Sequence, residues 1–322
     1  MIKPRLAIVL AAGVVVAACS SPPPPAPSAS PTVTATPEPE VLLAMTGQPA
    51  PDSWKPRPVI VVKVDNTVAG QPQIGIGQAD LVIEEPVEGG LTRLAGFFES
   101  RLPRVVGPAR SVRISDIGLV EPVRATVVAS GGAPDSLAAF ERADVTLYDE
   151  TSPAHFRDAG RVAPYNLFVN PREIDRMDKG RLPQQSYLSF GDSELPKGQP
   201  AKDVTITFSP SRSETWQWDR KSGHWQLDGQ KFRPDNILVM DVTTRDTGER
   251  DAAGSPIPEV ISTGGGRGYL MASGEAHKIN WSKVSTKAPF ELADARGREV
   301  EVPPGRTWVA LIVRGTGQVD FD

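Results

Sequence analysis

Apolar positions in the first part of the chain fall into short runs, which predict strands mixed with short helices. The β-branched run PVIVVKV at 58–64 is bounded by proline and by Asp65, so it predicts a buried strand. The same reading predicts further strands at 80–85, 91–98 and 124–130. Helices are expected at 115–123 with Ser115 as the N-cap, from Asp135 or Ser136 through Glu141, and at 171–177.

From Asp203 onward the pattern changes to short alternating segments without helix signals. Trp216 and Trp218 are two residues apart, so they share one strand face, where they are expected to form a core layer. GGGRG at 264–268 is interpreted as a turn or bulge, and 244–256 as a polar loop. The predicted strands are 203–209, 214–220, 224–229, 236–242, 259–264, 268–272, 277–281, 298–303 and 307–313.

These two patterns predict an α+β fold class. An N-terminal mixed α/β domain is expected over 55–200, followed by a mainly antiparallel β domain over 203–322. The boundary between them is expected in the glycine- and proline-containing segment near 195–203.

The N-terminal residues carry the pattern of a bacterial lipoprotein signal. Lys3 and Arg5 precede a short apolar run, and small residues stand directly before Cys19. The run is too short to span a bilayer, which needs roughly 20 apolar residues. Residues 1–18 are therefore predicted to be a signal peptide, after whose removal Cys19 becomes a lipid-acylated N-terminus. The segment 19–45, rich in Pro, Ser and Thr, is expected to be a solvated linker, which places the protein on the outer face of the cytoplasmic membrane.

Composition excludes several classes of function. The formal net charge is −4, and removing Lys3 and Arg5 with the signal makes it −6 (−4 − 2), which argues against a nucleic-acid partner. With Cys19 as the single cysteine there is no internal disulfide and no cysteine metal site. The three histidines lie far apart, and GIGQAD at 75–80 lacks the third glycine of a dinucleotide fingerprint. We expect no metal and no cofactor.

The candidate chemistry is a run of carboxylates followed by a series of arginines. Residues 80–88 carry four acidic and no basic residues, whereas 93–113 carry five arginines and the single acid Glu99. Arginine presents a planar donor fork that fits carboxylates and phosphates. In one interpretation the groups form an internal ion-pair network, with Arg93 near Glu84 or Glu85 across a hairpin. In the other they line an anion-binding groove, with GPARSVR at 107–113 as its loop.

The same residues carry a resemblance to the YerB-like bacterial lipoproteins. It rests on the block 65–100, on GPARSVR, on RVAPYNLF at 161–168, and on INWSK and PPGRTWVALIV in the second half. The resemblance implies a lipid-anchored envelope protein in two parts, both of unknown function. By motif it carries over the positions Asp65, Asn66, Asp80, Glu84, Glu88, Thr92, Arg93, Pro108, Arg110, Ser111, Arg161 and Pro164. Family members commonly have a histidine where this chain has Tyr165, which weakens any scheme with an imidazole base there.

Two hypotheses for function follow. The favoured one is a non-enzymatic binding or scaffold protein, anchored through Cys19, whose partner is an anionic cell-wall component or an envelope protein. The alternative is a hydrolase of wall polymers that uses two of Glu84, Glu88 and Asp80 as acid and base. Arg110 either presents its fork to a ligand or pairs internally with Glu84, Glu88 or Asp116. The candidate ligand-binding residues are Asp65, Asn66, Asp80, Glu84, Glu88, Arg93, Arg110, Ser111, Arg113 and Arg161.

Overall fold

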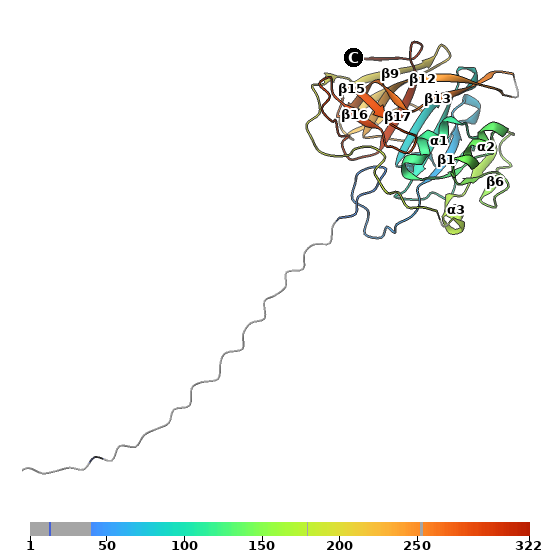
Figure 1. The fold of residues 1–322 in the computed structure, drawn as a ribbon, viewed down its shortest axis with the longest axis horizontal. Coiled ribbons are helices and arrows are strands. Elements are labelled where there is room, and N and C mark those ends of the chain that lie inside the picture. Colours follow the sequence, from blue (N-terminus) through green and yellow to red (C-terminus); the bar gives the residue numbers. More distant parts are fainter. Residues whose placement is uncertain (1–12, 14–39, 179, 252–253) are drawn as a thin grey trace, which may run out of the picture. The chain divides into compact units, whose positions relative to one another are not determined.

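The computed structural model describes residues 13, 40–178, 180–251 and 254–322, and Glu40–Asp322 form one compact unit (Figure 1). The predicted signal peptide, Cys19 and most of the predicted linker lie outside the described residues. The fold is α+β and rich in strands, as the sequence predicts.

A 12-stranded sheet forms the body of the molecule, in the order β16-β15-β14-β12-β17-β2-β3-β1-β4-β5, with β13 paired to β12 and β8 to β15. Its strands from the first half of the chain are β1 (Ile60–Asp65), β2 (Leu81–Pro86), β3 (Thr92–Phe98), β4 (Thr126–Val128) and β5 (Leu147–Tyr148). Those from the second half are β8 (Gln199–Pro200), β12 (Asn236–Arg250), β13 (Pro256–Ile261), β14 (Gly264–Ala272), β15 (Glu275–Lys283), β16 (Glu291–Ala293) and β17 (Thr307–Val313).

Strand β17 joins the two halves of the chain. It pairs in parallel with β2 on one side and with β12 on the other, while the other pairs among the second-half strands of this sheet are antiparallel. The mainly antiparallel character predicted for the second half is therefore present, with a parallel connection at β17. Because one sheet contains both halves, the division into domains at 55–200 and 203–322 stays a prediction.

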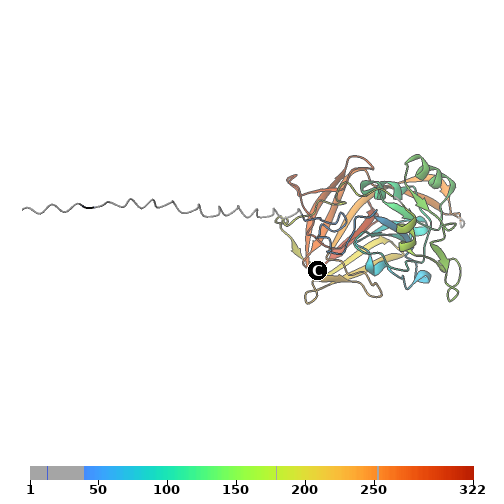
Figure 2. The same cartoon turned by 90° about the horizontal axis from the view of Figure 1, so that it is seen from below.

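The central sheet is covered on both faces. One face packs against a four-stranded sheet formed by β11 (His224–Gln226), β10 (Arg212–Asp219), β9 (Asp203–Ser209) and β18 (Gln318–Phe321). The opposite face packs against α1 (Ser115–Val120), α2 (Pro134–Arg142) and nearby loops. In Figure 2 the yellow strands of the small sheet and the green helices lie on opposite sides of the blue and cyan strands. The remaining elements are α3 (Pro171–Met177), β6 (His155–Arg157), β7 (Leu167–Val169) and the 3-10 turns η1 (Val68–Gly70), η2 (Ile76–Gln78), η3 (Glu88–Gly90) and η4 (Glu121–Val123).

Alternation along the strands divides the core into two clusters. Val61 of β1 packs with Leu119 of α1 in the helix-side cluster, whereas Val62 packs with Trp216 of the small sheet. We call these the helix side and the sheet side of the central sheet. Trp218 packs against the same cluster as Trp216, which confirms the predicted core layer. Adjacent residues on β1 and β2 therefore point into two different environments.

Several local predictions need correction. Ser115 is the first residue of α1 and not its cap; its hydroxyl instead accepts a 2.8 Å hydrogen bond from the amide of Val260. GGGRG lies inside β14, where a Cβ at Gly268 would come within 2.1 Å of the carbonyl oxygen of Val239. Glycine there permits close strand contact and does not make a turn.

Two further segments differ from their predicted structure. The predicted polar loop 244–256 is largely the extension of β12 and β13, a hairpin that runs beyond the core. Residues 298–303 form isolated bridges in place of a strand. The predicted helix 171–177 is correct, with the side chain of Asn170 capping the amide of Arg172.

Candidate functional site

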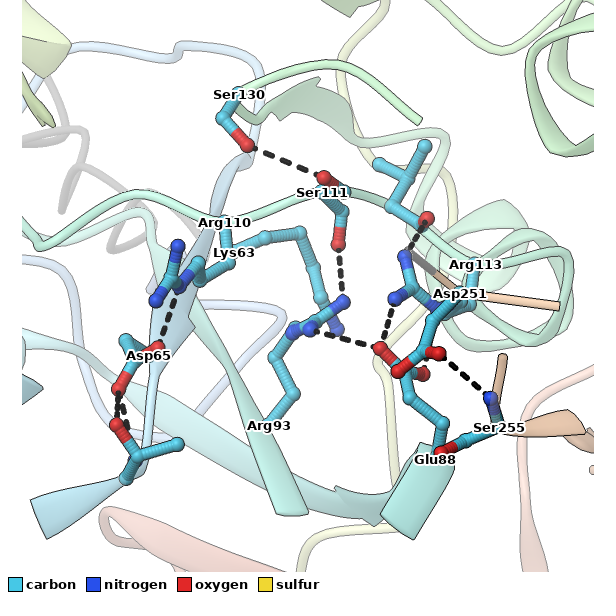
Figure 3. Close-up of polar contacts among 12 residues, drawn as sticks. Lys63, Asp65, Glu88, Arg93, Arg110, Ser111, Arg113, Ser130, Asp251 and Ser255 are labelled. Carbon is cyan, nitrogen blue, oxygen red and sulfur yellow. Dashed lines mark hydrogen bonds and ion pairs between the residues drawn. The ribbon is translucent and has the colours of Figure 1, made fainter. Parts of the chain in front are cut away.

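The ends of three strands bring the predicted acidic and basic residues to one edge of the central sheet. In the strand register, Arg93 on β3 lies opposite Asp65 at the end of β1 and opposite Glu85 near the end of β2. The loop 107–113 crosses the same edge, where the amide of Arg110 donates to the carbonyl of Lys63 at 2.9 Å. Arg93 lies beside the GPARSVR loop, where its Nη1 donates to the carbonyl of Ser111 (Figure 3).

Arg110 is held by Asp65 and not by any of the three acids considered from sequence. Its Nε donates to Oδ2 of Asp65 at 2.5 Å, and the other oxygen of Asp65 accepts from the amide and hydroxyl of Thr67. The guanidinium lies 4.6 Å from the ring centroid of Tyr165, and Nη1 donates to the carbonyl of Pro164 at 3.3 Å. The tyrosine at the position of the family histidine thus supports Arg110 through its ring.

Arg93 and Arg113 share one carboxylate, that of Glu88. Arg113 donates to both oxygens of Glu88, and Nη2 of Arg93 forms a 3.6 Å ion pair with Oε1. Burial opposes ionisation of Glu88, but the hydrogen bonds from Arg113 and the two positive charges lower its pKa. Burial and the charge of Arg113 lower the pKa of Arg93 to about 10, so Arg93 stays cationic at neutral pH. Two arginines here face a single acid.

Ser111 and Arg161 complete this edge. The carbonyl of Ser111 accepts from Nη1 of Arg93 at 2.9 Å, and its hydroxyl lies 3.3 Å from that of Ser130 (Figure 3). Arg161 donates to the backbone carbonyls of Gly70 and Pro72, so its charge is not matched by a carboxylate among its hydrogen-bond partners. It ties the loop after β1 to the loop between β6 and β7.

Beneath the arginines lies a buried triad that sequence reasoning did not assign as a site. Nζ of Lys63 is 2.5 Å from carboxylate oxygens of both Glu85 and Asp116, and all three side chains are almost fully buried. Burial, together with the charge of Asp116, raises the pKa of Glu85 to about 7, although Lys63 opposes the shift. The sequence feature that could have revealed the triad is Lys63 within an apolar strand, because a buried lysine needs an acidic partner.

Glu84 belongs to a different network on the sheet side. Its Oε1 accepts from Asn66 at 2.8 Å, from Thr92 at 2.6 Å and from Nη2 of Arg212 at 2.9 Å. The same Nη2 reaches Glu214 at 2.8 Å, so one arginine serves two buried acids. Burial and the nearby charge of Glu84 raise the pKa of Glu214 well above its ordinary value. Sequence reasoning missed Arg212 and Glu214, although Glu214 shares the β10 face of Trp216.

Asp80 lies apart from the other predicted residues. It precedes β2, at the opposite end of that strand from Glu84 and Glu88. Its Oδ2 accepts from the amides of Glu99 and Ser100 at 2.6 and 2.8 Å, which fixes the turn after β3. Burial raises its pKa against these hydrogen bonds. Asp80 therefore stabilises the turn after β3 and does not belong to the edge at which the arginines lie.

The arrangement is suited to holding charge and offers little for hydrolysis. Glu84 and Glu88 are each held by an arginine, and Glu84 is fully buried. A general acid needs a raised pKa and access to substrate, whereas the pKa of Glu88 is lowered.

Among the described residues, no group of His, Cys, Asp and Glu is placed to hold a metal ion. Within the same residues, no helix has the length and apolar character needed to cross a bilayer.

Comparison with known families defines the class of this protein. Residues 45–184 match the N-terminal domain, and residues 204–309 the C-terminal domain, of the family described as "Protein of unknown function (DUF3048)". The chain therefore belongs to this two-part family, which agrees with the resemblance seen in its sequence.

One relative in this class is YerB of Bacillus subtilis (strain 168), which is named as a candidate lipoprotein. It is 25% identical over 280 residues, which cover 80% of this chain and 81% of YerB. The crystal structure of the YerB protein from Bacillus subtilis superposes with a TM-score of 0.73 at 20% identity, covering 87% of this chain and 100% of that one. The fold described above is thus the YerB fold.

Proposed function

We propose that this is a lipid-anchored protein on the outer face of the cytoplasmic membrane, which binds an anionic group at its arginine edge. We define the arginine edge as Arg93, Arg110, Arg113 and Arg161. The anchor is argued from the signal pattern before Cys19 and from the lipoprotein name of the relative. A diacylated cysteine supplies the two chains that stable anchoring requires.

The observation that carries the binding proposal is an excess of positive charge at this edge. Among the described residues, three of the four arginines form ion pairs with two carboxylates, those of Asp65 and Glu88. The fourth, Arg161, donates to backbone carbonyls and lies over the ring of Phe168. Counting the buried triad, five cations face four acids, one of which has a pKa of about 7. A bound carboxylate or phosphate would neutralise the excess positive charge, and the hydroxyls of Ser111 and Ser130 could donate further hydrogen bonds to it.

The supporting geometry is the partial exposure of these side chains. The side chains of Arg93 and Arg110 are 12% and 17% exposed, enough for contact with a ligand while the paired acids hold them in position. A preorganised donor binds at lower entropic cost than a free surface arginine. The ligand class this fits is an anionic polymer or headgroup of the cell envelope.

The test compares Arg110→Lys and Arg161→Gln with Arg245→Lys, an exposed arginine that pairs with Glu259 outside this edge. The full chain in detergent is titrated with wall fragments that retain or lack their phosphate-bearing polymers. We expect tight binding only with the phosphate-bearing fragments, about tenfold weaker in each edge variant and unchanged in the control. Equal binding by all variants, or a melting temperature that falls in parallel with affinity, would refute the proposal.

A further inference from the structure

A polar cavity lies near the start of β1, at the other end of that strand from the arginine edge. Its volume is about 670 Å³, within the range of small-ligand sites. Thr126 at the start of β4 lines it and pairs with Ile60, the first residue of β1. Asp65 is the last residue of β1, and five residues of strand span about 17 Å. The two sites are therefore separate.

Side-chain hydrogen bonds between distant segments fix the wall of this cavity. Nε2 of Gln185 donates to the carbonyls of Pro122 and Lys287, both at 3.0 Å. The hydroxyl of Thr126 donates to Asp178, and Arg181 pairs with Asp144. These contacts join η4, β4, the α2–β5 turn and the loop before β16 into one frame. The hollow is thus built by specific bonds and is not a gap between loose loops.

Three charged side chains of the lining take no part in the side-chain hydrogen bonds that hold the cavity wall together. Glu121 has a buried carboxylate oxygen, Oε2, with no hydrogen-bond partner. Among the described residues, the side chains of Arg124 and Lys287 take part in no hydrogen bond or ion pair. Lys283, which lies close enough to Glu121 to feel its charge, donates instead to the carbonyls of Thr286 and Ala288. A buried carboxylate oxygen without a donor is costly, which indicates that a ligand supplies one.

Two helical segments end at the cavity. Arg124, with φ = 53°, is the C-terminal cap of η4, and Asp144, with φ = 55°, follows the C-terminal cap of α2. Both residues line the cavity. A left-handed residue is a common way to end a helix, so these helix ends fix part of the cavity wall.

The leftover charges define the chemistry of the ligand. Arg124 and Lys287 act on Asp144 only through their charge and form no ion pair, so both can bind a carboxylate. The unsatisfied oxygen of Glu121 suits an ammonium group. We propose that this cavity binds a small zwitterion, an amino acid or short peptide with both termini free. Arg124 and Lys287 hold its carboxylate, and Glu121 holds its ammonium group. This role is independent of the arginine edge.

The experiment measures binding of three peptides to the full chain in detergent by calorimetry. The peptides are Ala-Ala, N-acetyl-Ala-Ala, which lacks the ammonium group, and Ala-Ala amide, which lacks the carboxylate. We expect Ala-Ala to bind and each derivative to bind about tenfold more weakly or worse, because each loses a charged hydrogen bond. Absence of binding at millimolar peptide, or equal binding of all three, would overturn the proposal.

Matched variants assign the two ends of the ligand. Glu121→Gln removes the preference for Ala-Ala over its acetylated form, and Arg124→Gln removes the preference over its amide. Glu141→Gln and Arg142→Gln, exposed residues on α2 outside the cavity lining, leave both preferences intact. Arg110→Lys likewise leaves Ala-Ala binding unchanged, so failure at the arginine edge is distinguished from failure here. If the cavity variants bind all three peptides as the wild type does, the assignment is wrong.

Discussion

The two faces of the central sheet carry two polar networks that differ in sign and in access. On the helix side, Lys63 and the arginines Arg93 and Arg113 meet Glu85, Glu88 and Asp116, and the outer arginines are partly exposed. On the sheet side, Arg212 alone meets Glu84 and Glu214, whose side chains are 0% and 2% exposed. Together with Arg110 and Arg161 of the arginine edge and with Asp65, the helix-side network has one cation more than acids. The sheet-side network has one acid more than cations, and that acid is buried.

The difference shows how one strand contributes to two networks. Glu84 and Glu85 are neighbours on β2, but alternation directs them to opposite faces. On the sheet side, burial and the charge of Glu84 raise the pKa of Glu214, which favours uptake of a proton by the surplus acid. On the helix side the surplus cation lies near solvent, where an anion can neutralise it. The closed network stabilises the contact between sheets, and the open one is available for binding.

The largest effect is expected from Lys63→Met, which removes the cation shared by two buried acids. Loss of one partner of a buried ion pair costs about 3–5 kcal/mol in the free energy of unfolding. Denaturant unfolding of Lys63→Met is compared with Lys278→Met, a lysine on the exposed positions of β15. A loss below that of ordinary surface variants would mean that the triad does not stabilise the helix side.

Arg212→Met is expected to destabilise less, by about 2–3 kcal/mol, because the Arg212 side chain is 24% exposed and water reaches it. It leaves Glu84 and Glu214 facing each other without a cation, so the loss should grow as the pH rises. The measurement is the unfolding free energy at two pH values, with Arg220→Met, an exposed arginine in the turn after β10, as the control. A loss independent of pH would argue against a shared proton on the sheet side.

Glu85→Gln tests the pH dependence of the helix side. The pKa of Glu85 is raised in the folded protein to about 7, so the folded state holds a proton that the unfolded state releases above about 4.5. Stability from this group is therefore complete at low pH and is lost as the pH rises from about 4.5 to about 7. Replacement by glutamine should flatten this decline in an unfolding series across that window. An unchanged slope would place the titration elsewhere.

Tyr165→Ala is expected to give the smallest effect. The ring lies against the guanidinium of Arg110, a contact worth about 0.5–1 kcal/mol at a partly exposed site. Thermal unfolding should show a correspondingly small loss, and affinity for the anionic ligand should fall because Arg110 loses its support. Tyr165→Phe retains the ring and serves as the control. If Phe and Ala behave alike, the tyrosine hydroxyl and not its ring is important.

The sequence predicted most of the strands and the edge at which charged residues gather, because both follow from local patterns. The apolar runs of β1–β3 and the series of arginines after Glu88 are visible without a structure. The partner of Arg110 was not predictable, since Asp65 is 45 residues away and reaches it only because the loop of Arg110 pairs with the end of β1. The role of Arg212 was equally hidden, because it depends on how the small sheet packs over β2. The cavity around Glu121 requires contacts from Gln185 and Lys287 that no local pattern encodes.

The position of β17 between β2 and β12 has a consequence for when the protein can fold. The side chain of Arg306, directly before β17, donates to the carbonyl of Ala79, 227 residues earlier in the chain. Until β17 is available, β2 and β12 both present open edges, which are templates for aggregation. Contacts of such sequence separation also slow folding. Under the export proposed above, a chain delivered from its N-terminus would complete this sheet only after nearly all of it has emerged, so one late strand would order export and folding in time.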